Sequence, residues 1–265
     1  MTQNQQPRTP SPDAGETCLQ WEPCPGLPSQ IAPLALIRRD GVSLAEASPI
    51  RVPAFYRGQS SKPGYYWMAS IGGHVSHESK AERLYLMERD WAGTATGVLP
   101  QPFRLHFPRT TRPFRHIPDF LTQHADGSHE VVDVKGARQQ DKPLNKLTFD
   151  LTREACAELG FGFTVYAGPT TITEANLAFL AGYRGPGAAV LDEYLPALVD
   201  AADGGEPTVA DAIKRLMGAG VMPAIAPAIV WRGMWKRLFT CDLLSPLTSA
   251  TRIRLSVPAD MEGAA

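Results

Sequence analysis

The chain has 265 residues, of which 43% are apolar and 20% charged, and its formal net charge is −1. These values are ordinary for a globular protein of one large domain or two small ones. They exclude a chain that binds nucleic acid through its overall charge, so any basic surface must be local. No apolar run approaches the ~18 residues of a membrane helix, and we expect no membrane partner.

The N-terminal segment predicts little ordered structure. Residues 1–33 contain seven prolines and few large apolar side chains, so we expect a disordered or loosely attached arm there. The segment has no apolar core of a secretory signal, and we expect a cytoplasmic protein. Cys18 and Cys24 have no histidine nearby and do not match zinc spacing, so we expect reduced thiols.

Residues 34–184 have the pattern of one mixed α/β domain. The expected elements are a strand over 65–71, a helix over 76–90, a strand over 103–107, a hairpin over 116–124 and 129–135, a helix over 144–159 and a strand over 161–166. Ser79 and Glu82 form an S-x-x-E capping pattern in the first helix. Gly127 supplies the flexible position of the hairpin turn. The last strand, reached through a helix, should pair in parallel with the hairpin.

Residues 185–265 predict a separate helical module. Arg-Gly-Pro-Gly at 184–187 interrupts the preceding pattern, and helices are expected over 188–202, 209–217 and 224–238. A short hairpin within 243–255 follows, which gives a module of winged-helix size. Trp231 and Trp235 lie one helical turn apart. They either fill a small core or anchor a protein partner.

Three residues of the predicted hairpin, Asp119, Asp133 and Lys135, are candidates for metal binding and catalysis. Side chains alternate along a strand, so Val131, Asp133 and Lys135 should share one face while Val132 and Val134 face the core. Asp119 enters the partner strand beside Asp133. Two carboxylates at one corner can hold a hard divalent cation, and Lys135 can orient the attacking water and stabilise a phosphoryl transition state.

Each of these signals also has an ordinary structural interpretation. A Pro-Asp pair is common in turns, an Asp-x-Lys pair is common on a solvated strand face, and Glu82 fits the outer face of a helix. The joint order of a helical acid, Pro-Asp, a turn and Asp-x-Lys favours a metal site with Glu82 as a third acid. Glu78 lies one turn earlier on the same face and is the alternative helical acid.

Basic residues flank the proposed site. A run from 100 to 118 contains no acid and leads directly into Asp119, and further cations follow Lys135. Such cations suit contacts to a nucleic-acid backbone. The expected DNA-binding residues are Arg104, Arg109, Arg112, Arg115, Arg138, Lys142 and Lys146.

At these residues the sequence resembles the TnsA-like endonuclease subunits of heteromeric transposases, within the PD-(D/E)xK nuclease superfamily. The resemblance covers roughly residues 64–168 and, more weakly, the C-terminal module. It rests on HVSHESKAERLYLMERD at 74–90, QPFRL at 101–105, IPDFL at 117–121 and EVVDVK at 130–135. It implies a restriction-endonuclease-like αβββαβ core. It also implies that Glu82, Asp119, Asp133 and Lys135 are the catalytic residues, although the founding member has Gln where this chain has Asp133.

The resemblance further implies cleavage of transposon 5′ ends with Mg²⁺, for which Mn²⁺ substitutes. The implied partners are transposon-end DNA, an integrase-type transposase and an AAA+ transposition ATPase, with the C-terminal module contacting the protein partners. Two alternatives stay open because fold alone does not fix function. One is a stand-alone restriction- or repair-type nuclease, and the other is a nuclease-derived DNA-binding scaffold without activity.

Overall fold

The computed structural model describes residues 15–53, 62–108, 114–203 and 205–256. The chain divides into two compact units, 1–168 and 169–265. The predicted boundary after residue 184 therefore falls inside the second unit. The reason is helix α5 (Thr171–Leu180), which packs against helix α8 and whose Asn176 amide donates to the carbonyls of Leu243 and Ser245.

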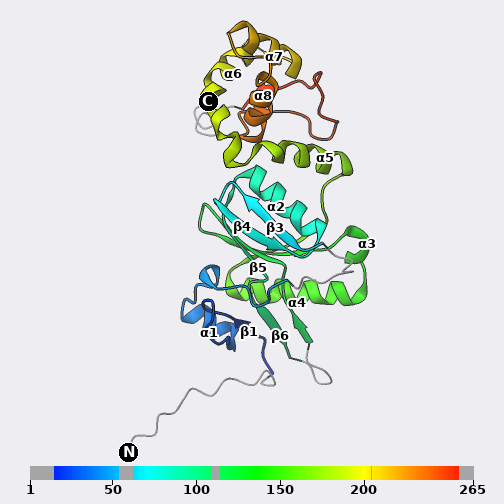
Figure 1. Ribbon diagram of the computed structural model, residues 1–265. Coiled ribbons are helices and arrows are strands. Elements are labelled where there is room, and N and C mark those ends of the chain that lie inside the picture. Colours follow the sequence, from blue (N-terminus) through cyan, green and yellow to red (C-terminus); the bar gives the residue numbers. More distant parts are fainter. Residues whose placement is uncertain (1–14, 54–61, 109–113, 204, 257–265) are drawn as a thin grey trace, which may run out of the picture. The chain divides into compact units, whose positions relative to one another are not determined.

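The first unit is a mixed α/β structure (Figure 1). Its main sheet has the order β10-β9-β8-β5. Its strands are β5 (Ala95–Pro100), β8 (Phe120–His124), β9 (His129–Val134) and β10 (Gly162–Tyr166). The β8–β9 hairpin turns at Gly127 with a φ of +82°, as predicted. The parallel pairing of β9 with β10 is also confirmed. Helix α4 (Pro143–Leu159) makes the crossover and packs along β10.

A second sheet corrects the prediction of a loose N-terminal arm. Its order is β2-β1-β6-β7, with β1 (Cys18–Trp21), β2 (Gln30–Pro33), β6 (Arg104–Phe107) and β7 (Phe114–His116). Leu19 and Trp21 are buried with Leu105 and Phe107 in one apolar cluster. Residues 15–33 were therefore wrongly predicted as part of a disordered or loosely attached arm, because two apolar side chains and pairing with β6 hold them. Residues 1–14 lie outside the described part.

The first strand of the site sheet also differs from the prediction. The sequence predicted a strand at 103–107 and none at 95–100, but β5 is the strand beside the hairpin and pairs Leu99 with Leu121. The change of sheet follows Gln101, which has a φ of +44°. Its backbone N–H donates to the Asp119 carbonyl at 2.8 Å, and its carbonyl accepts from Ile50. This turn ends β5 and sends β6 into the other sheet.

Helix α2 (Lys80–Ala92) carries the helical acid. It begins later than predicted because Gly73–His77 forms strand β4, paired with β3 (Gly64–Met68). The Ser79 side chain caps the helix by accepting from the Glu82 N–H, and Gly93 ends it in the left-handed region. Leu84 and Met87 are buried as expected. The remaining helical elements of this unit are α1 (Leu34–Arg39), η1 (Leu44–Glu46) and α3 (Ala137–Gln140).

The second unit consists of helices and one two-stranded sheet. Its elements after α5 are η2 (Ala181–Tyr183), η3 (Pro186–Tyr194), α6 (Leu195–Ala202), α7 (Val209–Gly218), α8 (Ala226–Trp235), β11 (Phe239–Thr240) and β12 (Arg254–Leu255). The predicted helix over 188–202 is thus a 3-10 segment followed by an α-helix. Trp235 lies in the core, whereas Trp231 stays partly exposed against Phe179. Within the described ranges, no helix has the length and apolar character needed to cross a membrane.

Candidate functional site

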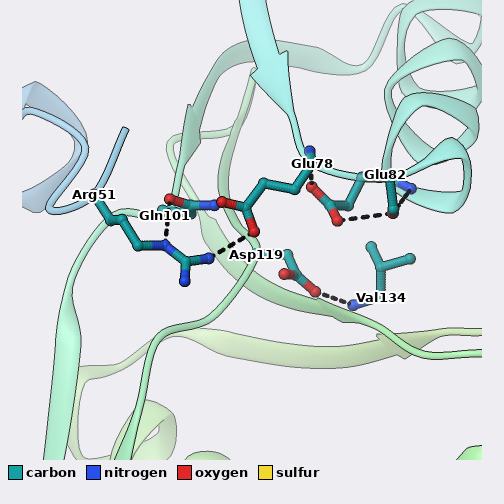
Figure 2. A network of polar contacts seen from close by, with 7 residues as sticks. Arg51, Glu78, Glu82, Gln101, Asp119 and Val134 are labelled. Atoms are coloured by element: carbon teal, nitrogen blue, oxygen red, sulfur yellow. Dashed lines mark hydrogen bonds and ion pairs between the residues drawn. The ribbon is translucent and has the colours of Figure 1, made fainter. Parts of the chain in front are cut away.

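Asp119 lies at the centre of the candidate site. It immediately precedes β8, and its backbone N–H donates to the Val132 carbonyl, which continues the β8–β9 ladder by one step. One carboxylate oxygen accepts from the Val134 N–H at 2.6 Å (Figure 2). The hairpin therefore fixes this side chain against the end of β9, opposite Asp133.

The electrostatics of Asp119 identify its neighbours. The pKa of Asp119 is raised from its usual value near 3.8 to about 8, first by burial and then by the negative charges of Glu82 and Asp133. The Val134 N–H and the Lys135 ammonium act in the opposite direction. The charges of Glu82, Asp133 and Lys135, the other three residues predicted from the sequence, thus all act on Asp119. Three acids with one nearby cation form a site at which an added divalent cation would relieve repulsion.

Glu82 faces Asp119 from the first turn of α2. It is 8% exposed, and its oxygens accept from the Ser79 hydroxyl and the Glu78 N–H, each at 2.7 Å. Burial raises its pKa. Glu78 instead forms an ion pair with Arg51 at 2.6 Å. Because the charge of Glu82 is among the main causes of the raised Asp119 pKa and Glu78 is paired with Arg51, Glu82 fits the helical acid better.

Asp133 is more deeply buried than the sequence suggested. Only 3% of the residue is exposed, and its two oxygens each lie 2.9 Å from His116 Nε2. Val131 and Val132 are fully buried on opposite faces of β9, so the expectation of one solvated face was wrong. The reason is coverage on both sides, because α2 contacts β9 and Val131 packs with Cys156 of α4.

Lys135 follows the last residue of β9. Its backbone is fixed at both ends, since its N–H donates to the Tyr166 carbonyl and its carbonyl accepts from the Gln140 amide. The side chain is partly exposed, and its charge lowers the pKa of Asp119. A rigid backbone with an accessible ammonium suits a group that must meet a substrate.

The predicted DNA-binding residues separate into two groups. Arg138, Lys142 and Lys146 are exposed directly after Lys135, on α3 and the start of α4, and Lys146 pairs with Asp141 at 3.2 Å. Arg104 and Arg115 belong instead to the second sheet, where Arg104 donates to the Gln20 side chain. Arg109 and Arg112 lie outside the described residues.

Sequence reasoning did not identify three residues beside the site. His116 was noted only within a basic run, although it contacts Asp133. Arg51 binds both Glu78 and the Gln101 side chain, the latter at 3.2 Å (Figure 2). Gln101 is 4% exposed and supports the Asp119 backbone. Its position in the Gln-Pro-Phe motif was the available signal, but local sequence does not predict contacts between distant segments.

The donor set fits a hard divalent cation in its chemistry. Carboxylate oxygens are the preferred ligands of Mg²⁺, and the negative charges of Glu82 and Asp133 both act on Asp119. Figure 2 shows Glu82 and Asp119 in this site. In the described ranges, no three His, Cys, Asp or Glu side chains are already arranged as a ligand set. Each acid instead has a protein donor: the Val134 N–H for Asp119, His116 for Asp133, and Ser79 for Glu82. These carboxylate oxygens each keep a further lone pair that could bind an ion.

Comparisons with known proteins do not assign the chain to a family. No protein-family model matches the sequence, and the search of curated proteins finds no match.

Proposed function

We propose that the protein is a Mg²⁺-dependent DNA endonuclease with a restriction-endonuclease-like core and an active site of the PD-(D/E)xK type. The observation that carries this proposal is the electrostatic convergence of Glu82, Asp133 and Lys135 on Asp119. The order α2, β5, β8, β9, α4, β10 agrees with an αβββαβ core, with β6 and β7 inserted into a second sheet. Perturbed acids clustered around one point are typical of catalytic sites.

The roles of the residues follow from their positions. Asp119 and Asp133 would hold the ion, with Glu82 as a third ligand or as a group that orients a bound water. When bound, Mg²⁺ supplies Lewis acidity to the scissile phosphate and lowers the pKa of water. Lys135, which has the only ammonium group among these four residues, is placed to orient the nucleophile and to stabilise negative charge on the phosphate. The exposed Arg138 and the lysines after it would hold the DNA backbone.

The biological setting that we propose is cleavage at transposon 5′ ends, in a complex with an integrase-type transposase and an AAA+ ATPase. The support is the resemblance of four sequence segments to the TnsA-like subunits. Within the second unit, helices α6, α7 and α8 together with the two-stranded sheet β11–β12 match the element content of a winged-helix-like module. Its Trp231 and Phe179 form a partly exposed aromatic pair with ring centroids 5.0 Å apart. Such a pair is suited to docking a protein partner.

The decisive experiment compares Asp119→Ala and Lys135→Ala on end-containing plasmid DNA with Mg²⁺. Both variants should lose at least about a hundredfold in cleavage rate. Calorimetry should separate their roles: Asp119→Ala weakens Mg²⁺ binding, whereas Lys135→Ala leaves the affinity unchanged or increased, because a neighbouring cation has gone. Near-parental cleavage by Lys135→Ala would refute the proposal that the Asp-x-Lys pair is part of the active site. A parent protein that binds DNA but never cuts it would favour the scaffold alternative.

A further inference from the structure

His116 connects the second sheet to the candidate metal site. It is the last residue of β7, where it pairs with Leu105 of β6, and it lies three residues before Asp119. Its Nε2 is 2.9 Å from both oxygens of Asp133. The Asp133 side chain is 4% exposed and the His116 side chain 20% exposed. The histidine therefore approaches a buried carboxylate from the more accessible side.

The geometry restricts what this ring nitrogen can do. An ionised carboxylate only accepts hydrogen bonds, so Nε2 must carry the proton when it faces Asp133. A protonated ring nitrogen has no free lone pair and cannot bind a cation. Asp133, by contrast, keeps further lone pairs on both oxygens. The contact thus leaves Asp133 able to bind an ion and gives His116 a supporting role.

We propose that His116 is a positioning residue for the divalent-ion site: it holds the Asp133 carboxylate in the orientation that binds the ion. The inference rests on the proposed nuclease function and adds a residue to its site. A buried carboxylate is costly without a hydrogen-bond donor, and His116 supplies one from a different sheet. The β6–β7 insertion therefore contributes directly to the site rather than only to folding.

The test is calorimetric titration of the full chain with Mn²⁺, which needs no cleavage. His116→Ala should weaken Mn²⁺ binding by about 10–100-fold, the usual effect of losing a group that orients a metal ligand. His116→Gln keeps an N–H at a similar reach and should stay within about threefold of the parent. The matched control is His124→Ala. His124 is also near a carboxylate, with Nε2 3.7 Å from Glu130, and its loss should leave Mn²⁺ affinity unchanged.

The outcomes separate this inference from the proposed function. Parental Mn²⁺ affinity in His116→Ala, or equal weakening in the Ala and Gln variants, overturns the positioning role while leaving nuclease activity to stand. A parent that binds Mn²⁺ without cutting DNA overturns the nuclease, and the variants still decide the role of His116. A parent that binds no Mn²⁺ overturns both. If His116→Ala does not fold, His116→Asn replaces it in the test. The shorter Asn amide should not reach Asp133, so this variant should bind Mn²⁺ weakly, whereas His116→Gln should not.

Discussion

Replacing Asp119 with Asn should stabilise the metal-free protein at alkaline pH. The amide in Asp119→Asn keeps an oxygen that can accept from the Val134 N–H, but the substitution removes a charge that lies beside Glu82 and Asp133. The pKa of Asp119 is raised to about 8 by burial and by these two acids. Between its usual pKa and about 8 the unfolded chain is ionised at this position while the folded protein retains the proton. The parent therefore loses stability as pH rises through this window.

The size of the effect follows from the shift in pKa. A rise from 3.8 to about 8 corresponds to a ceiling of about 6 kcal/mol of destabilisation above pH 8. Asp119 is partly exposed, and solvent screening reduces this value. We expect Asp119→Asn to raise the free energy of unfolding by about 1–3 kcal/mol at pH 8.5, and by much less near pH 4.

Urea unfolding of both proteins at a series of pH values, with and without Mg²⁺, provides the assay. The raised pKa of Glu82 adds a pH slope to both proteins, so the difference between them reports the Asp119 charge together with its interaction with Glu82. Saturating Mg²⁺ should reverse the order, because an ion at 1,000 times its dissociation constant adds about 4.1 kcal/mol to a protein that binds it. A parent and variant of equal stability at pH 8.5 would refute the clustered-acid interpretation. Equal stabilisation of both by Mg²⁺ would refute Asp119 as a ligand.

Two further predictions concern the organisation of the chain. A fragment ending at Gly168 should retain Mg²⁺-dependent nicking and lose partner binding, because the site residues all lie in the first unit. A fragment that folds but does not nick plasmid DNA would contradict this prediction. In the second unit, a methyl group added at Gly233 would lie 2.5 Å from the Leu198 side chain, so Gly233→Ala should cost about 0.5–2 kcal/mol of stability after its helix-propensity gain. Gly218→Ala, which meets nothing within 4 Å, is the control and should be neutral or slightly stabilising in thermal unfolding.

Local sequence was sufficient to predict the elements that hold the site. The β8–β9 hairpin is encoded by alternating apolar residues and a turn whose Gly127 has positive φ. The start of α2 was signalled by the Ser79–Glu82 pattern, although the helix begins a few residues later than expected. These features depend on residues close together in the chain, and that is why Asp119 and Asp133 could be placed opposite each other.

The features that were missed depend on pairing between distant segments. Nothing within residues 15–33 indicates that Leu19 will be buried, because β1 becomes a strand through its pairing with β6 more than 80 residues later. The choice of β5 rather than β6 as the neighbour of β8 depends similarly on the unusual backbone angle of Gln101. Local propensity therefore predicted α2, the β8–β9 hairpin, α4 and β10, but it missed β1, β2 and β5 and did not give the assignment of strands to sheets.

The burial of Asp133 shows how contacts between distant segments affect the proposed metal site. Strand alternation correctly places Asp133 on the same face as Val131, but it does not say what covers that face. In the structure α4 covers Val131 and a histidine from the second sheet meets Asp133. A carboxylate on an open face would exchange water for a metal ion freely. Asp133 instead has a protein donor already, so the metal affinity of this site should depend on the second sheet, and especially on His116.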